Sequence, residues 1–217
     1  MKTVVIRGSD QSFDLSYAAE ALTRGALVAV PTETVYGLAA NGLDSSAVER
    51  IYDVKGRPAI KPLSLLVPDI IAAEDFCRDI PREALTLAEA FWPGPLTIIL
   101  HRLSVVPDIV TAGGATVGLR CPDHPITIEL LRLSGIPAAA PSANPSGMPS
   151  PKTADEVLSY FDGKIDCIVD GGECRLGLES TIIDLTVTPP KIIRQGALAV
   201  EEIWKVLKVQ KEQPTKT

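Results

Sequence analysis

The 217-residue sequence has few aromatic side chains, few histidines and few cysteines. Aromatic residues make up 5% of the chain, so a core must be built mainly from Ala, Val, Leu and Ile. The four cysteines, Cys77, Cys121, Cys167 and Cys174, include no C-x-x-C pair, and only two histidines are present. A structural zinc site and a disulfide framework are therefore disfavoured, and we expect reduced thiols.

The sequence also lacks an excess of basic residues and a long apolar run. Its net charge is −6, whereas proteins that grip a nucleic-acid backbone non-specifically carry a broad excess of Lys and Arg. No uninterrupted apolar run approaches the ~18 residues that a membrane span requires. The first ten residues, MKTVVIRGSD, contain no apolar segment of the signal-peptide type. We expect a soluble, cytoplasmic protein with no membrane partner.

The sequence also lacks the short motifs that are typical of common nucleotide-binding and hydrolase sites. Neither G-x-x-x-x-G-K-[ST] nor G-x-G-x-x-G occurs, so a bound nucleotide would have to be held by a scattered site. Ser142 does not lie in a G-x-S-x-G elbow, which argues against a hydrolase nucleophile. His101 and His124 also lack a triad-like setting.

Short apolar runs alternate with helical patterns along the chain. Strands are predicted at 3–6, 26–30, 63–67, 96–100, 116–120, 136–140, 165–169, 180–185 and 191–194. Helices are predicted at 14–24, 46–54, 69–77, 81–91, 125–133, 153–161 and 200–207. This alternation is typical of an α/β domain with a mixed, strongly twisted sheet flanked by helices. We expect one domain over residues 1–207, followed by a polar tail at 208–217 that frays or begins a linker.

Two helix ends carry specific signals. Ser46 and Glu49 are spaced as a capping box for the second helix, and Gly56 is expected to end it. Thr153 is expected to cap the helix that runs to Phe161.

The stretch from Pro31 to Pro62 combines two kinds of chemistry. It begins with hydroxyl groups, a tyrosine and a glycine, and it ends with Lys55, Arg57 and Lys61 on a proline-punctuated loop. Such cations suit phosphates, although as isolated residues they are also explained as solvated charges.

Four predicted strands end in polar residues beside proline or glycine. They end at 30–34, 118–120, 140–144 and 193–195. Ligands of open α/β sheets collect at strand ends, so these loops are expected to converge on a site, the alternative being ordinary surface turns. Arg120 follows an apolar strand and needs either a structural carboxylate or a ligand anion as partner. Arg194 allows the same two interpretations.

Six segments then occur in a specific order. They are PTETVYGL (31–38), KGRP (55–58), the strand ending at Arg120, PSAN (141–144), STIID (180–184) and IIRQG (192–196). Together they resemble the YrdC/Sua5 family, the L-threonylcarbamoyladenylate synthases of tRNA modification, over about residues 10–207. The resemblance implies a YrdC-like α/β domain with a concave ligand-binding cleft. Some members of this family continue into a second, C-terminal domain.

The resemblance implies a nucleotidyltransferase reaction. L-threonine and bicarbonate or CO2 form N-carboxylated threonine, which attacks the α-phosphate of ATP to give threonylcarbamoyl-AMP and pyrophosphate. A downstream threonylcarbamoyl-transferase machinery then modifies adenosine 37 of tRNA (the t6A modification). Mg²⁺ is expected with ATP. Because no paired-carboxylate metal site is evident in the sequence, the ion is expected to be held largely by ATP and water.

The resemblance also implies roles for individual residues. Thr32, Arg120 and Ser180 would hold threonine, with Arg120 on its carboxylate. ATP would be surrounded by Lys55, Arg57, Lys61, Thr116, Ser142, Asn144, Ser150 and Arg194. Lys55 and Arg57 would be the catalytic groups, and Thr34 and Tyr36 would be further lining groups.

Two other functions are compatible with the same segments. One is a module of this fold that binds double-stranded RNA or tRNA without nucleotide turnover; the low aromatic content and the acidic charge count against it. The other is an ATP-binding or carbamoyl-transfer protein with another acceptor. The related carbamoyltransferase that matures hydrogenases carries C-x-x-C motifs, which this chain lacks.

Overall fold

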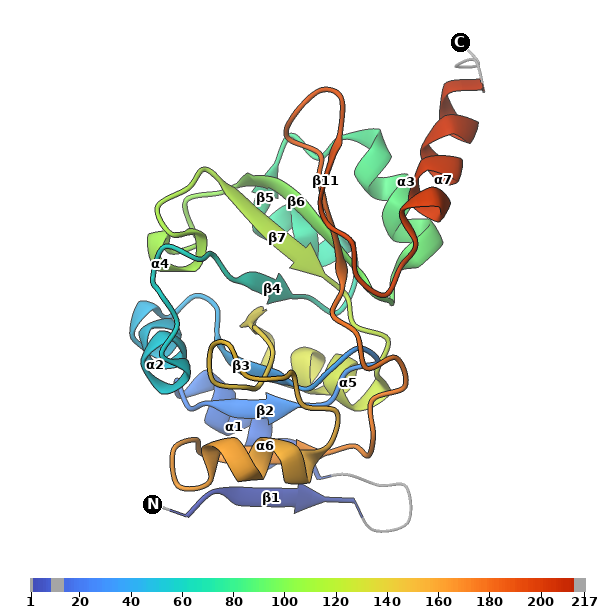
Figure 1. Ribbon diagram of the computed structural model, residues 1–217. Coiled ribbons are helices and arrows are strands. Elements are labelled where there is room, and N and C mark those ends of the chain that lie inside the picture. Colours follow the sequence, from blue (N-terminus) through green and yellow to red (C-terminus); the bar gives the residue numbers. More distant parts are fainter. Residues whose placement is uncertain (1, 9–13, 213–217) are drawn as a thin grey trace.

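The computed structural model describes residues 2–8 and 14–212 as one mixed β-sheet with helices on both of its faces (Figure 1). The sheet has eleven strands in the order β1-β9-β2-β3-β8-β4-β7-β6-β10-β11, and β5 pairs with β6 outside this path. The predicted α/β class with a mixed sheet is confirmed: β4 and β7 are parallel, for example, whereas β6 and β7 are antiparallel.

The strands are short, and most are covered on both faces. Their bounds are β1 Val4–Arg7, β2 Val28–Val30, β3 Gly37–Asn41, β4 Ser64–Leu66, β5 Cys77–Arg78, β6 Leu96–Arg102, β7 Thr116–Arg120, β8 Ala138–Ala139, β9 Cys167–Asp170, β10 Thr181–Asp184 and β11 Lys191–Arg194. In β2 all three residues are buried, and alternate side chains enter opposite core layers: Ala29 enters one, Val28 and Val30 the other. A period of two explains this division.

The helices cover the sheet from both sides. Their bounds are α1 Ser16–Thr23, α2 Ser45–Lys55, α3 Arg82–Phe91, α4 Asp108–Thr111, α5 Pro125–Ser134, α6 Ala154–Phe161 and α7 Val200–Glu212, with a 3-10 helix at Ile71–Asp75. α1 packs against α5 and β3, α6 packs against β9, and α3 packs against α7. Within the ranges described above, no helix has the length and apolarity needed to span a membrane.

Several predictions about local structure are wrong. The segment 69–77, predicted as a helix, contains a 3-10 helix at Ile71–Asp75, and Cys77 begins strand β5. The helix α2 begins one residue earlier than expected, and its cap is the Asp44 side chain, which accepts hydrogen bonds from the backbone N–H groups of Ser46 and Ala47, rather than a box of Ser46 and Glu49. Strand β3, with the sequence GLAAN, was not among the predicted strands. It pairs antiparallel with β2, so residues 31–36 form the loop of a hairpin.

Other end signals are confirmed. Thr153 and Glu156 form a complete capping box on α6, and Gly56 ends α2 in the left-handed conformation at φ 57°. The last helix continues to Glu212, five residues beyond the expected end at Leu207. The remainder of the predicted tail, 213–217, lies outside the described residues.

Candidate functional site

Strand ends and loops from distant parts of the chain enclose a cavity of about 160 Å³ near the middle of the sheet. The residues on its wall come from the hairpin loop, the segment 57–66, strands β6 and β7, the loop 140–142 and the segment 179–194. Its charged lining side chains are Arg57, Arg120, Glu179 and Arg194. Five of the predicted site residues therefore meet on one wall, namely Arg57, Arg120, Ser142, Ser180 and Arg194.

The hairpin loop between β2 and β3 is folded by Thr32. The Thr32 hydroxyl accepts the N–H groups of Thr34 and Val35 at 3.2 Å each and donates to the Val35 carbonyl at 2.6 Å. Thr32 is only 3% exposed and is not on the cavity wall, whereas Thr34 and Val35 are. Thr32 therefore acts on the site through the shape of the loop.

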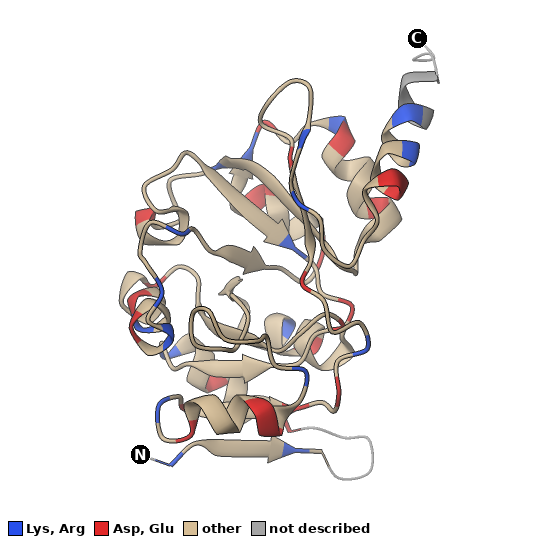
Figure 2. Cartoon of the chain, in the orientation of Figure 1, with Lys and Arg blue, Asp and Glu red and all other residues tan. Residues whose placement is uncertain are grey.

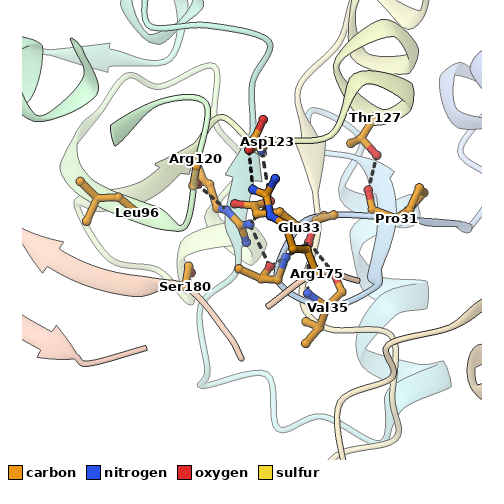
Figure 3. Close-up of polar contacts among 12 residues, drawn as sticks. Pro31, Glu33, Val35, Leu96, Arg120, Asp123, Thr127, Arg175 and Ser180 are labelled. Atoms are coloured by element: carbon orange, nitrogen blue, oxygen red, sulfur yellow. Dashed lines mark hydrogen bonds and ion pairs between the residues drawn. The ribbon is translucent and has the colours of Figure 1, made fainter. Parts of the chain in front are cut away.

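Arg120 is held in place by partners on three sides (Figure 3). Its Nη2 lies 2.8 Å from Glu33 Oε2 and donates to Thr34 Oγ1 at 2.8 Å, while its Nε donates to the Gly94 carbonyl at 3.2 Å. The expected partner of this buried cation is thus a carboxylate of the same chain. Glu33 was missed in the sequence because nothing in the pattern PTETV distinguishes a buried acid from an exposed one.

Ser180 lines the same cavity as Arg120, and its hydroxyl accepts a hydrogen bond from Arg194 Nη2 at 3.4 Å. Its hydroxyl is 2.8 Å from that of Thr97, and both side chains are buried and line the cavity. Thr97, on β6, is a second residue that the sequence did not reveal. The cavity wall therefore presents the Thr34 hydroxyl next to the fixed Arg120 guanidinium and the Ser180 hydroxyl next to that of Arg194, and such pairs of groups suit a carboxylate.

Lys55, Arg57 and Lys61 lie in three different environments. Lys55 is 3% exposed, lies off the cavity wall, and donates from Nζ to the carbonyls of Ser142 and Asn144, so that it organises the loop that carries Ser142. Burial and the nearby Arg57 lower the pKa of Lys55 to about 8, and Glu179 opposes this shift. Arg57 lines the cavity, and its guanidinium donates to the carbonyls of Lys61 and Pro62. Lys61 is exposed and is not on the wall.

The loop 141–150 places its two predicted residues differently. Ser142 forms a β-bridge with Gly37 and lines the cavity. Asn144 is buried and turns its Nδ2 to the carbonyls of Pro145 and Met148, so it fixes the loop and is not on the wall. Ser142 and Asn144 therefore do not share one edge of the cavity, because the chain bends at 143–144 directly after the bridge at Ser142.

Ser150, Thr116 and Tyr36 were also predicted to contact ligands, and none of the three lines the cavity. Ser150 lies next to the cavity, where its hydroxyl donates to Glu179 at 3.1 Å. Thr116 begins β7, four residues before Arg120, and is not on the wall. Tyr36 does not line the cavity: it is fully buried, and its hydroxyl donates to the Gly172 carbonyl at 2.8 Å. Burial raises the pKa of Tyr36 well above its usual value.

A sequence profile described as telomere recombination, shared by the Sua5, YciO and YrdC proteins, matches residues 20–196. The chain belongs to this family. It is 50% identical over 202 residues to a threonylcarbamoyl-AMP synthase of Pyrococcus abyssi, covering 93% of the chain and 59% of that protein. It is also 45% identical over 194 residues to the Bacillus subtilis threonylcarbamoyl-AMP synthase, covering 89% and 56%. The chain thus spans little more than half the length of these relatives.

Other members match over nearly their whole length. A putative threonylcarbamoyl-AMP synthase of Mycobacterium tuberculosis is 40% identical over 193 residues, or 88% of each chain. Among solved structures, Pyrococcus abyssi Sua5 complexed with L-threonine superimposes with a TM-score of 0.91 at 46% identity, covering 100% of this chain and 66% of that one. E. coli YciO superimposes with a TM-score of 0.81 at 25% identity, covering 93% and 98%. The Sua5/YciO/YrdC fold is therefore established.

Proposed function

We propose that the chain is a threonylcarbamoyl-AMP synthase that uses L-threonine, bicarbonate or CO2, and ATP. The names of its curated relatives and the threonine-bound state of a 46% identical structure support this proposal. The observation that carries it is the cavity itself, whose lining combines Arg120 and buried hydroxyl groups with Arg57, Arg194 and Ser142. One cavity thus offers groups for an amino-acid carboxylate beside groups for phosphates.

The proposed reaction needs no protein nucleophile. The neutral threonine amine forms a bond to carbon and gives a carbamate. With CO2 the nitrogen releases a proton to solvent, and with bicarbonate water leaves in its place. A carbamate oxygen then attacks the α-phosphorus of ATP, and the bond to the bridging oxygen breaks so that pyrophosphate leaves. Holding the reactants in contact and compensating phosphate charge can supply most of the rate enhancement.

In this proposal the amino acid lies at the Arg120 end of the cavity. Arg120 binds the carboxylate, and Ser180 and Thr34 offer hydroxyl groups, with Thr32 shaping the loop behind them. Arg57 is the catalytic cation that compensates charge on the phosphates, together with Arg194 and Ser142. Lys55 contributes its charge from behind the Ser142 loop, and Asn144, Ser150, Thr116 and Lys61 act from outside the wall.

A divalent cation fits this site when ATP brings it. Among the described residues no group of three or more His, Cys, Asp or Glu side chains could hold a metal ion, and Glu179 is the single carboxylate on the wall. The chemistry of that wall suits Mg²⁺ held by phosphate oxygens and water rather than by a protein cage. Mg²⁺ would supply charge neutralisation on the phosphates.

The product would pass to a threonylcarbamoyl-transferase machinery that modifies tRNA in the cytoplasm. No specific feature favours the alternative of an RNA-binding module. In Figure 2 the Lys and Arg residues are interspersed with Asp and Glu rather than gathered into a stripe. A basic stripe is the usual footprint of direct RNA binding.

The test is a synthesis assay on the purified chain with ATP, radiolabelled bicarbonate and one amino acid at a time. We expect pyrophosphate release and labelled threonylcarbamoyl-AMP with threonine, and far less with serine, valine or alanine. Pyrophosphate release that does not depend on threonine would overturn the proposal. Tight tRNA binding with no turnover of ATP would favour the RNA-binding alternative.

A further inference from the structure

Glu179 is the acidic exception on an otherwise basic cavity wall. Among the described residues that line the cavity, the other charged side chains are Arg57, Arg120 and Arg194. Glu179 and Ser180 are the two residues directly before β10, so the segment that brings Ser180 to the cavity also brings this carboxylate. A negative charge among groups suited to phosphates requires an explanation, because it repels the same ligands.

The Glu179 carboxylate already binds two groups that could otherwise contact a phosphate, the Arg194 guanidinium and the Ser150 hydroxyl. Oε2 forms an ion pair with Arg194 Nη1, and Oε1 accepts a hydrogen bond from Ser150 Oγ at 3.1 Å. The other side of the Arg194 guanidinium is fixed, since Nε and Nη2 donate to the Ser180 carbonyl at 3.1 Å and 2.9 Å. A phosphate that takes the Nη1 edge of Arg194 therefore has to displace Glu179.

The charge of Glu179 also acts on Arg57 on the wall and on Lys55 behind it. Burial lowers the pKa of both Lys55 and Arg57, and Glu179 raises the pKa of each against that effect. The side chains of Glu179 and Arg194 are 39% and 41% exposed, so their ion pair is accessible to water and inexpensive to break. The carboxylate can thus exchange with a ligand anion without a change in the fold.

We propose that Glu179 is an internal counter-anion that occupies the polyphosphate-binding groups of the free protein and weakens its grip on pyrophosphate. The inference rests on the proposed function, in which pyrophosphate is the leaving group. A site built only of cations would hold this product tightly and slow the next turnover. Glu179 competes with the product for Arg194 and favours its release.

The test is calorimetric titration of inorganic pyrophosphate into the full chain, in magnesium-free buffer with EDTA at low salt. Glu179→Gln keeps the size of the side chain and removes its charge. We expect its Kd for pyrophosphate to fall by about tenfold, since a like charge beside a binding site costs affinity. The gain should shrink as salt is raised, because the carboxylate is partly exposed.

Asp79→Asn is the matched control. It makes the same change in net charge and breaks an exposed ion pair with Arg78 that lies outside the cavity. Asp79 has a positive φ of 53°, a conformation that asparagine also tolerates, so the fold should be kept. We expect its Kd for pyrophosphate to equal that of the wild type.

Each outcome decides the matter. An unchanged or weaker affinity in both Glu179→Gln and Glu179→Ala would overturn the counter-anion role, since a residue that positions Arg194 would show a loss in both. Equal gains in Glu179→Gln and Asp79→Asn would also overturn it, because only net charge would then matter. If neither the wild type nor Glu179→Gln binds pyrophosphate, the polyphosphate site fails, and the proposed function fails with it.

Discussion

Glu33 and Arg120 form a buried ion pair in which Oε2 and Nη2 are 2.8 Å apart, with side-chain exposures of 1% and 9%. The two residues belong to different parts of the sheet: the hairpin loop after β2 and the end of β7. Glu33 Oε2 also accepts the backbone N–H of Asp123 at 3.1 Å, so the oxygen that pairs with Arg120 is itself held by the backbone. Arg120 is therefore fixed before any ligand arrives, which reduces the entropy that binding would cost.

Replacement of Glu33 by Gln should destabilise the protein. It leaves the Arg120 charge buried without its counter-charge, and breaking such a pair costs about 3–5 kcal/mol. Denaturant unfolding of Glu33→Gln and wild type measures the difference. The free energy of unfolding of the double variant Glu33→Gln, Arg120→Met should exceed that of Glu33→Gln alone; a double variant that is less stable would contradict the pairing.

Arg120→Ala should damage the use of threonine much more than the use of ATP. In the proposed arrangement Arg120 binds the amino-acid carboxylate, and removing one partner of a buried charged contact costs roughly 2–5 kcal/mol. We expect the KM for threonine to rise by at least about 30-fold while the KM for ATP changes by a small factor. Equal increases in both constants would show that Arg120 has been assigned to the wrong ligand.

Arg57→Ala and Lys61→Ala form a matched pair on one loop. Arg57 lines the cavity, whereas Lys61 is exposed and lies off the wall. A charge-assisted contact to phosphate is worth about 1.5–3 kcal/mol, so Arg57→Ala should raise the KM for ATP by roughly tenfold to a hundredfold. Lys61→Ala should have a much smaller effect. Steady-state kinetics with ATP varied checks the order, and a larger loss in Lys61→Ala would place the phosphates outside the cavity.

ATP affinity should fall as pH rises through about 8. The pKa of Lys55 is lowered to about 8, first by burial and then by Arg57, so its amine is charged below this pH and neutral above it. A positive charge near the phosphates favours the anion, hence the direction of the change. Titration of ATP between pH 6.5 and 9.5 gives the profile. In Lys55→Met the step near pH 8 should vanish, and its persistence would assign it to another group.

Tyr36→Phe should affect stability and leave catalysis nearly intact. The Tyr36 hydroxyl donates to the Gly172 carbonyl and accepts the Gly171 N–H at 3.2 Å, and no part of the side chain lines the cavity. Loss of this buried hydroxyl should cost about 1–3 kcal/mol of unfolding free energy. Thermal unfolding and kcat/KM for threonine are measured side by side. A large loss of kcat/KM in a stably folded Tyr36→Phe variant would show that the Tyr36 hydroxyl has a direct role in the site.

Local chemistry explains which elements could be predicted. Strand β7 at Thr116–Arg120 and strand β11 at Lys191–Arg194 have the predicted bounds, because short apolar runs between turn residues have few alternatives. Strand β3 escaped prediction because GLAAN has weak β-propensity, and it is a strand only by pairing with β2 and β8. Asp44 and Ser46 are both residue types that cap helices. The structure shows that Asp44 is the N-cap, because its extended backbone conformation lets its side chain accept the first N–H groups of α2.

The α/β class, the family and five of the residues that meet at one cavity could be predicted from the sequence; these residues are Arg57, Arg120, Ser142, Ser180 and Arg194. These features can be predicted because each motif consists of residues that are neighbours in the chain, so it can be recognised without knowledge of the fold. The tertiary structure alone decided that Glu33 neutralises Arg120, that Lys55 lies behind the wall, and that Glu179 occupies Arg194. These contacts join positions from 15 to 87 residues apart. Burial and ion pairing between such positions are set only when the sheet brings its strand ends together.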